Sequence, residues 1–232
     1  MLEPFLFEAR PNPIRILAQN AAVIVVDMQN DFGSVGGMFE RAGIDIAPIK
    51  AAVEPTARVL AAARKAGIPV IYLQMQHRPD LADMGAADSP HRQRHMRLSV
   101  GTSTKAPDGT EGGILIAGTW GTQILAALKP EPHDIVVPKH RFSGFYETEL
   151  NTILQGLGAK HLVFTGCTTS ICVESTIRDA MYRDYHCVLL EDCTAEPIGN
   201  GNSRSNHDAS LLTIEMLFGW ISDSQKFIAA LS

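Results

Sequence analysis

The chain has 232 residues, of which 45% are hydrophobic and 19% charged, and its formal net charge is −5. This composition is typical of a soluble globular protein of one large domain, and the scattered basic residues argue against a nucleic-acid surface. No apolar run approaches the roughly 20 residues of a membrane span, and the N-terminus, MLEPFLFEARPNP, is a poor signal peptide, so we expect a cytoplasmic protein that binds neither membrane nor nucleic acid.

Five short, nearly continuous apolar runs predict buried strands. In chain order they lie at residues 21–27, 68–75, 133–139, 161–166 and 186–192. Hydrophobicity that is continuous rather than alternating is typical of strands covered on both faces, as in a parallel sheet.

Helical patterns separate or follow these strands. Apolar residues recur at helical spacing in residues 46–67, 147–158, 175–185 and 206–220. The first two patterns end at Gly67 and near Gly158, which are plausible C-terminal caps. Alternation of strand and helix predicts an α/β fold, a doubly wound, mostly parallel sheet with helices on both faces, formed by residues 1–232 as a single domain.

A long insert interrupts this alternation at residues 76–118. It is rich in Gly, Pro, Asp and His and has no strand signal, so we expect loops over the active-site face. A mobile, substrate-covering segment and a passive surface excursion are both compatible with this composition.

Four cysteines, Cys167, Cys172, Cys187 and Cys193, lie in one short region. A secreted disulfide scaffold would be smaller and denser in cysteine. The spacings fit neither the CxxC pairs nor the clustered histidines of a zinc site. We therefore expect reduced thiols.

Polar residues follow several of the predicted strands. Asp27 ends the first, Lys139 ends the third, and the fourth leads through a short turn to Cys172. Ligands bind at the carboxyl ends of parallel strands. At that edge, a helix start and a lysine would favour the thiolate form of the cysteine, and an aspartate could accept the thiol proton and later donate it. Taken singly, each residue also fits a structural role: a capping Asp, a solvated Lys, a buried apolar Cys.

Three stretches carry a resemblance to a known family. VIVVDMQNDF, VVPKHRFSGFYETEL and VFTGCTTSICVESTIRDAMYRDYHCVLLEDCT, in this order along nearly the whole chain, resemble the isochorismatase-like cysteine hydrolases. The resemblance implies a catalytic triad of Asp27, Lys139 and Cys172, and a cis peptide bond between Cys167 and Thr168. It further implies an oxyanion held by the backbone N–H groups of Thr168 and Cys172.

Within the family, the likeness is strongest to ureidoacrylate amidohydrolases, through DMQN, GTWGTQI, PKHRFSGF, CVESTIRD and IEMLFGWISD. HRPDLAD, at residues 77–83, is similar to biuret hydrolases instead. The Asp-x-His motif of the zinc-dependent nicotinamidase branch is missing, so we expect no metal and no cofactor, and we interpret His77 as an exposed loop histidine.

The resemblance implies cleavage of a C–N bond in a small ureido or amide substrate. Biuret, N-carbamoylsarcosine, maleamate and isochorismate are alternatives, as is a non-catalytic binding protein on the same fold. The residues that we expect to shape the pocket are Phe32, Asn30, Tyr146 and Trp120. For an acidic substrate we expect Arg141 to bind the carboxylate, with Arg78 and Arg92 as alternatives, and we expect a homo-oligomer, a dimer or a tetramer.

Overall fold

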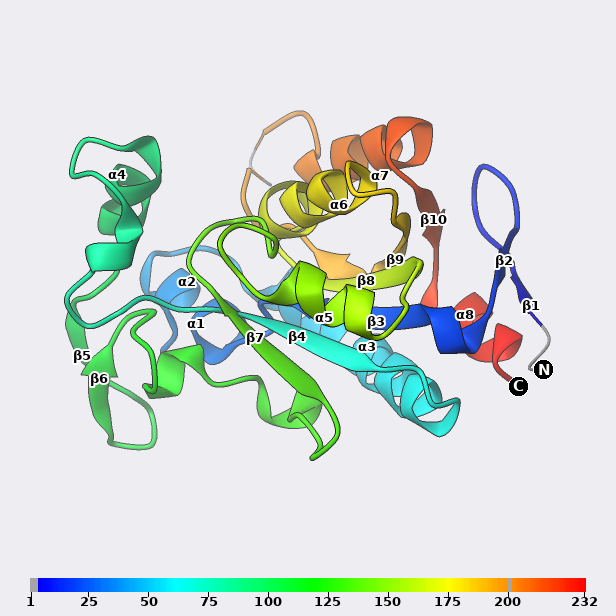
Figure 1. Cartoon of the computed structure of the whole chain (residues 1–232). Helices are drawn as coiled ribbons and strands as arrows, with labels where there is room; N and C mark the ends of the chain where they lie inside the picture. The colour runs from blue at the N-terminus through cyan, green and yellow to red at the C-terminus, as the bar shows by residue number, and fades with distance from the viewer. Residues whose placement is uncertain (1–3, 200–201) are drawn as a thin grey trace.

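A six-stranded sheet forms the centre of the molecule (Figure 1). The computed structural model describes residues 4–199 and 202–232. Every pair of neighbouring strands is parallel, which confirms the predicted doubly wound α/β fold. The strand order is β10(Trp220–Ser222), β9(His186–Ala195), β8(His161–Cys167), β3(Ala21–Val26), β4(Val70–Met75), β7(Ile135–Lys139).

Helices cover both faces of this sheet, and the pleat of β3 shows why its residues are apolar throughout. Successive side chains of a strand point to opposite faces: Val23 and Val25 join one core, whereas Ile24 and Val26 join the other. The first core lies against α3(Ala47–Lys65) and α8(Ser224–Ala230), and the second against α5(Leu150–Gly156), α6(Glu174–Met181) and α7(Asn206–Leu217).

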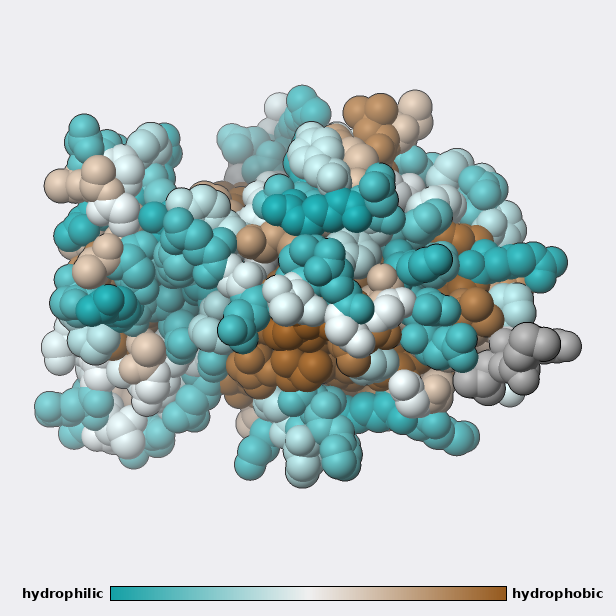
Figure 2. Space-filling model, in the orientation of Figure 1, coloured by the Kyte–Doolittle hydropathy of each residue, from teal (hydrophilic) through white to brown (hydrophobic). Residues whose placement is uncertain are grey.

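The edge strand β7 is less covered than its neighbours. Val136 is 41% exposed, and Figure 2 shows apolar surface where Figure 1 places β4 and β7. Pro138 lies within this strand, as expected of an edge, where a missing backbone donor is tolerated and discourages pairing with another chain.

The segment 76–118 has more regular structure than its composition suggested. It contains a helix and an antiparallel pair of strands, so the prediction of loops alone is wrong: η2(Ala82–Met84), α4(Pro90–Arg97), β5(Ser103–Lys105) and β6(Glu111–Gly113). In Figure 1 this segment lies at the end of the molecule away from both chain termini.

Further short elements lie outside the predicted pattern. The predicted helix at 206–220 ends early, and its last residue begins β10. The remaining elements are β1(Phe5–Phe7), β2(Ile14–Ile16), η1(Ala18–Asn20), α1(Asn30–Gly33), α2(Met38–Arg41), η3(Trp120–Thr122), η4(Ala126–Leu128) and the π-helical turn η5(Thr169–Val173). Across residues 4–199 and 202–232, no helix combines the length and the hydrophobicity that crossing a membrane requires.

Candidate active site

The strand register brings the three candidate catalytic residues to one edge of the sheet. Val26 pairs with Leu73 on one side and with Gly166 on the other, and Met75 pairs with Lys139. Asp27, directly after β3, therefore lies between the end of β8 and the end of β4, and Lys139 ends β7 on the other side of β4. Asp27 and Lys139 are each 1% exposed, and Cys172 is 7% exposed.

Asp27 and Lys139 form a buried ion pair. Nζ of Lys139 lies 2.7 Å from Oδ2 of Asp27, and also donates to the backbone oxygen of Arg141 at 3.1 Å. Apart from this ion pair, no well-oriented hydrogen bond reaches either carboxylate oxygen of Asp27 among the described residues, although the Cys172 thiol and the Met75 backbone lie close enough to lower its pKa somewhat. A buried carboxylate with spare acceptor capacity is unusual, and it leaves Asp27 able to take a proton. Asp27 also has a left-handed backbone, with φ of 51°, a conformation that clusters at functional sites.

Cys172 lies in the π-helical turn η5, which joins β8 to α6. Such turns occur often at functional sites. Hydrogen bonds hold this one on several sides: Ser170 N–H and Oγ donate to Glu196 Oε2 at 2.8 and 2.5 Å, and Thr176 Oγ1 donates to the Cys172 oxygen at 2.6 Å. The peptide bond between Cys167 and Thr168 is cis, as the family resemblance implied.

The electrostatics correct one expectation. Burial raises the pKa of the Cys172 thiol, and the nearby Lys139 ammonium only partly opposes this. The resting residue is therefore a thiol, not the thiolate that a helix start and a lysine were expected to favour. Burial likewise raises the pKa of Asp27 despite the attraction of Lys139. For Lys139, burial alone would lower the pKa, but the attraction of the neighbouring acidic groups, that of the Asp27 carboxylate above all, outweighs burial and raises it.

All four cysteines are free and buried, in agreement with the prediction of reduced thiols. Cys167 donates to the backbone oxygen of Asp27 at 3.2 Å. Burial raises the pKa of Cys187 and of Cys193, and neither lines the cavity that contains Cys172.

A cavity of about 470 Å³ opens above the three residues. Asp27, Cys172, Cys167 and Thr168 form its floor, and Phe32 lines it as predicted from the sequence. The other walls are mostly apolar: Met38, Phe39, Met75, Leu98, Leu115, Phe142, Ile171 and Ile198. A volume of this size suits a small molecule.

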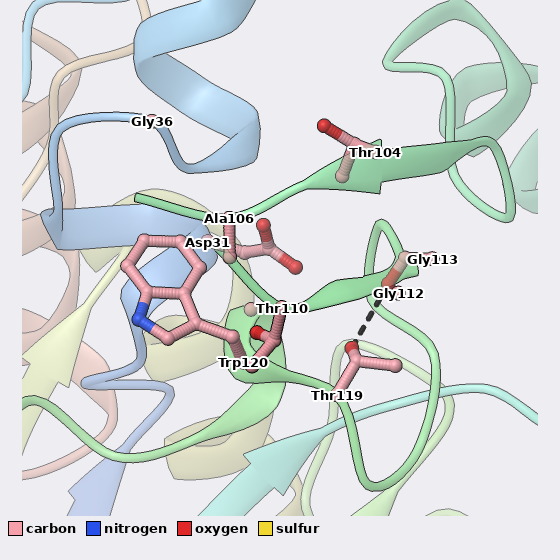
Figure 3. A pocket seen from close by; sticks show the side chains of 10 residues that line it. Asp31, Gly36, Thr104, Ala106, Thr110, Gly112, Gly113, Thr119 and Trp120 are labelled. Atoms are coloured by element: carbon pink, nitrogen blue, oxygen red, sulfur yellow. Dashed lines mark hydrogen bonds between the residues drawn. The ribbon is translucent and has the colours of Figure 1, made fainter. Parts of the chain in front are cut away.

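The structure places two of the predicted pocket residues elsewhere. Trp120 lines a separate cavity of about 10 Å³ beside Asp31, Thr110 and Thr119 (Figure 3), which is room for about one water. Asn30 donates from Nδ2 to the backbone oxygen of Trp120 at 2.9 Å, and so supports this neighbouring loop.

The predicted arginines also lie outside the cavity lining. Arg141 donates from one nitrogen to the backbone oxygens of Asp83 and His140, at 2.5 and 2.8 Å, and its guanidinium lies over Tyr146. Tyr146 is 45% exposed and lines a different surface pocket. Arg78 pairs with Asp80, and Arg92 donates to the backbone oxygens of Leu81 and Gly85.

Helix α4 contributes residues that the sequence did not suggest. Arg94, His95 and Arg97 line the cavity, the two arginines from its exposed rim. No ion pair holds Arg94 or Arg97 within the described part of the chain. The signal that could have revealed α4 is its start: Ser89 accepts from the Arg92 N–H, and Pro90 takes the first helical position.

His77 is not an exposed loop histidine. It is 1% exposed, its Nδ1 lies 3.2 Å from Asp83 Oδ1, and its ring contacts the rings of His91 and His95. His77, His91 and His95 thus form a cluster in space.

Comparisons with known proteins agree with this geometry. The isochorismatase domain model matches residues 21–226. The ureidoacrylate amidohydrolase RutB of Variovorax paradoxus is 40% identical over 225 residues, which cover 97% of this chain and 86% of the relative. A cysteine hydrolase from Pseudomonas syringae has a similar structure, with a TM-score of 0.78, 28% identity, and coverage of 100% of this chain and 98% of the other. An N-carbamoylsarcosine amidase from Thermoplasma acidophilum gives a TM-score of 0.65 at 26% identity, covering 88% and 96%.

Proposed function

Because this chain belongs to the isochorismatase family, we propose that it is a cysteine-dependent amidohydrolase that cleaves a C–N bond of a small ureido acid. The observation that carries this proposal is the buried position of Asp27 and Cys172 on the floor of one cavity, with Lys139 paired to Asp27 behind it. Its relatives' names, ureidoacrylate amidohydrolase and N-carbamoylsarcosine amidase, support the class of bond and of substrate.

In the first half of the reaction, the thiol proton of Cys172 passes to Asp27 as the sulfur attacks the substrate carbonyl carbon. The backbone N–H groups of Thr168 and Cys172 hold the resulting oxyanion. Lys139 stays protonated and keeps Asp27 oriented, since its Nζ lies 2.7 Å from Oδ2. The C–N bond then breaks, and the amine leaves with the proton that Asp27 carries.

In the second half, water hydrolyses the acyl-enzyme. The intermediate is a thiocarbamate for a ureido substrate and a thioester for a simple amide. Asp27 takes a proton from the water as the hydroxide adds to the carbonyl carbon. When the C–S bond breaks, Asp27 gives this proton to the sulfur, which returns Cys172 as a thiol and Asp27 as a carboxylate. No metal enters any of these steps, so we expect prolonged treatment with a chelator to leave the chemical steps, and therefore kcat at saturating substrate, intact.

The charges around the cavity favour a substrate with a carboxylate. Lys139 is already paired with Asp27, so it is not available to a substrate anion. Arg94 and Arg97 lie on the cavity wall and can supply the charge-assisted contact that an acid requires. Ureidoacrylate fits this arrangement, and an N-carbamoyl amino acid is a second candidate, because both carry a ureido group and a carboxylate.

The test compares kcat/KM for ureidoacrylate, N-carbamoylsarcosine, maleamate and neutral biuret. Arg94→Gln and Arg97→Gln should lower kcat/KM for the acids by roughly tenfold to a hundredfold, and for biuret much less. Arg78→Gln is the matched control, because Arg78 is exposed and pairs with Asp80. Preference for biuret with no discrimination by either cavity arginine would support a neutral substrate instead. Absence of turnover on every compound would favour a non-catalytic binding protein.

We also propose that residues 76–118 belong to the same domain as the sheet, because this segment supplies part of the cavity wall. We also propose that the protein is a cytoplasmic homo-oligomer. The mass of the protein in solution, compared with 25.2 kDa for one chain, tests the oligomeric state.

A further inference from the structure

Three histidines gather beside the proposed active site. His77 follows the end of β4, and His91 and His95 lie one turn apart on α4. One nitrogen from each ring lies within 4.8 Å of the others. Histidines at i and i+4 on one helix face, joined by a third from another element, form a common metal-binding pattern.

Hydrogen bonds fix which nitrogen of two rings is free. Nδ1 of His95 lies 2.8 Å from the backbone oxygen of His91. A carbonyl can only accept, so Nδ1 carries the proton and Nε2 keeps its lone pair. Nδ1 of His77 faces the Asp83 carboxylate at 3.2 Å, which leaves its Nε2 free in the same way. Ligand histidines are usually held through their second nitrogen by such a carboxylate or carbonyl.

Ring packing alone does not account for this cluster. The ring of His95 stacks on Phe142 and that of His91 lies against both, an arrangement that phenylalanine could supply. Yet Nε2 of His77 and Nε2 of His91 are buried and have no hydrogen-bond partner within the described residues. Unsatisfied buried nitrogens are costly and call for an explanation.

The three rings are neutral at physiological pH. Burial lowers the pKa of His77 to about 4 and of His91 to about 3, and it lowers the pKa of His95 as well. Neutral imidazole is the form that binds a metal.

We propose that His77, His91 and His95 bind a divalent transition-metal ion of the zinc class, with Asp83 as the outer partner of His77. The three nitrogens, which lie within 4.8 Å of one another, need to approach only slightly, because the ligand nitrogens of a tetrahedral zinc site lie about 3.3 Å apart. The positive charges of Lys139 and Arg141 oppose a cation at these rings, and the Asp83 carboxylate beside His77 offsets part of that repulsion.

Such an ion would join the end of β4 to α4. It would fix the helix that also carries Arg94 and Arg97, and so this wall of the cavity. The ion takes no part in the proposed chemistry, and its binding is therefore measurable without any assay of turnover.

The experiment measures Zn²⁺ binding to the metal-depleted Cys172→Ala protein by calorimetry or by competition with a chromophoric chelator. This background removes the active-site thiol as a competing ligand. We expect one saturable ion per chain. His91→Phe and His95→Phe keep an aromatic ring but remove the ligand, and should weaken binding by more than the roughly tenfold to hundredfold expected for Asp83→Asn.

His161→Phe is the matched control. His161 is also partly buried, and its Nδ1 has no hydrogen-bond partner among the described residues. It begins β8, and its ring packs against that of His186, which begins β9, so this variant should bind Zn²⁺ like its parent. X-ray absorption of the zinc-loaded Cys172→Ala protein gives a readout that needs no ligand variant, and we expect three imidazole ligands. Absence of saturable binding, unchanged affinity in both α4 variants, or a site without these imidazoles would overturn the proposal.

Discussion

Cys172 is a buried thiol with a raised pKa, and in the proposed mechanism a carboxylate, Asp27, takes its proton. Cys172→Ala and Cys172→Ser should therefore reduce kcat to the background level, because no other thiol lines the floor beside Asp27 except Cys167, which donates to the Asp27 backbone. Cys187→Ala and Cys193→Ala are the controls, and should keep most of the activity. Steady-state kinetics on the preferred substrate provide the measurement, and wild-type kcat in either Cys172 variant would contradict the proposed nucleophile.

The role proposed for Asp27 implies a pH dependence of the reaction, and the burial of this carboxylate determines its direction. Only the ionised carboxylate can accept the thiol proton, and burial raises its pKa. The profile of kcat/KM should therefore fall as the pH drops through this raised pKa, at a higher pH than an ordinary aspartate near 3.9 would give. Asp31→Asn removes another buried carboxylate of raised pKa and should leave this acid limb in place. An acid limb that disappears in that variant would assign the dependence to Asp31 instead.

At the scale of single residues, the sequence predicted the three candidate catalytic residues but not the residues of helix α4 that line the cavity. Asp27, Lys139 and Cys172 stand next to strand ends that hydrophobicity reveals, and the resemblance of their flanking motifs gave each a role. Arg94, His95 and Arg97 reach the cavity only because the insert folds back over the sheet edge. No periodicity in the sequence encodes that path.

The passage from β8 to α6 depends on one glycine. Gly166 has a φ of 113°, and a Cβ there would lie 2.0 Å from the backbone oxygen of its register partner Val26. Gly166→Ala should lower the free energy of unfolding by more than about 3 kcal/mol, because two neighbouring strands would have to separate.

Gly156 provides the comparison for this prediction. It is the last residue of α5, and a Cβ there would meet no atom of the described residues within 4 Å. Gly156→Ala should therefore raise the free energy of unfolding by roughly 0.5–1 kcal/mol. Urea denaturation of both variants is the measurement, and similar midpoints for the two would show that the close approach at Gly166 is easily relieved.

Among the elements, those with a strong apolar pattern were predictable and the polar ones were not. The five predicted strands are all present, because two-sided burial requires continuous apolar runs. Helix α4, with the sequence PHRQRHMR, has almost no apolar face, and only its cap marks its start. Strand β10 has three residues, too few for a pattern beside the longer helical signal of α7.

Contacts between the first residues and the last residues of the described chain join its two ends. Arg10 and Ile221 exchange backbone hydrogen bonds of 2.8 and 3.0 Å, and the ring of Phe7 packs edge-on against Phe227. Pairings over more than 200 residues leave no trace in local spacing. The sequence therefore predicted the sheet and its helices, but not how the two ends of the chain meet beside β9 and β10.

The stability of the whole molecule in acid should depend on the protonation of one side chain, that of His161. His161 begins β8, at the end of the strand opposite the cysteine turn, and burial, with the charges of His186 and Lys160, lowers its pKa from 6.5 to about 4. Between these two values the unfolded chain binds a proton that the folded protein rejects, so stability falls as the pH drops through this window. His161→Phe removes this proton uptake. The difference in the free energy of unfolding between the variant and the wild type should therefore be more favourable to the variant near pH 4 than above pH 6.5, by on the order of 2 kcal/mol. Denaturant unfolding across the pH range measures the difference, with exposed His133→Gln as the control expected to parallel the wild type. If His161→Phe also parallels the wild type, the ring is protonated in the folded protein and its burial has no such cost.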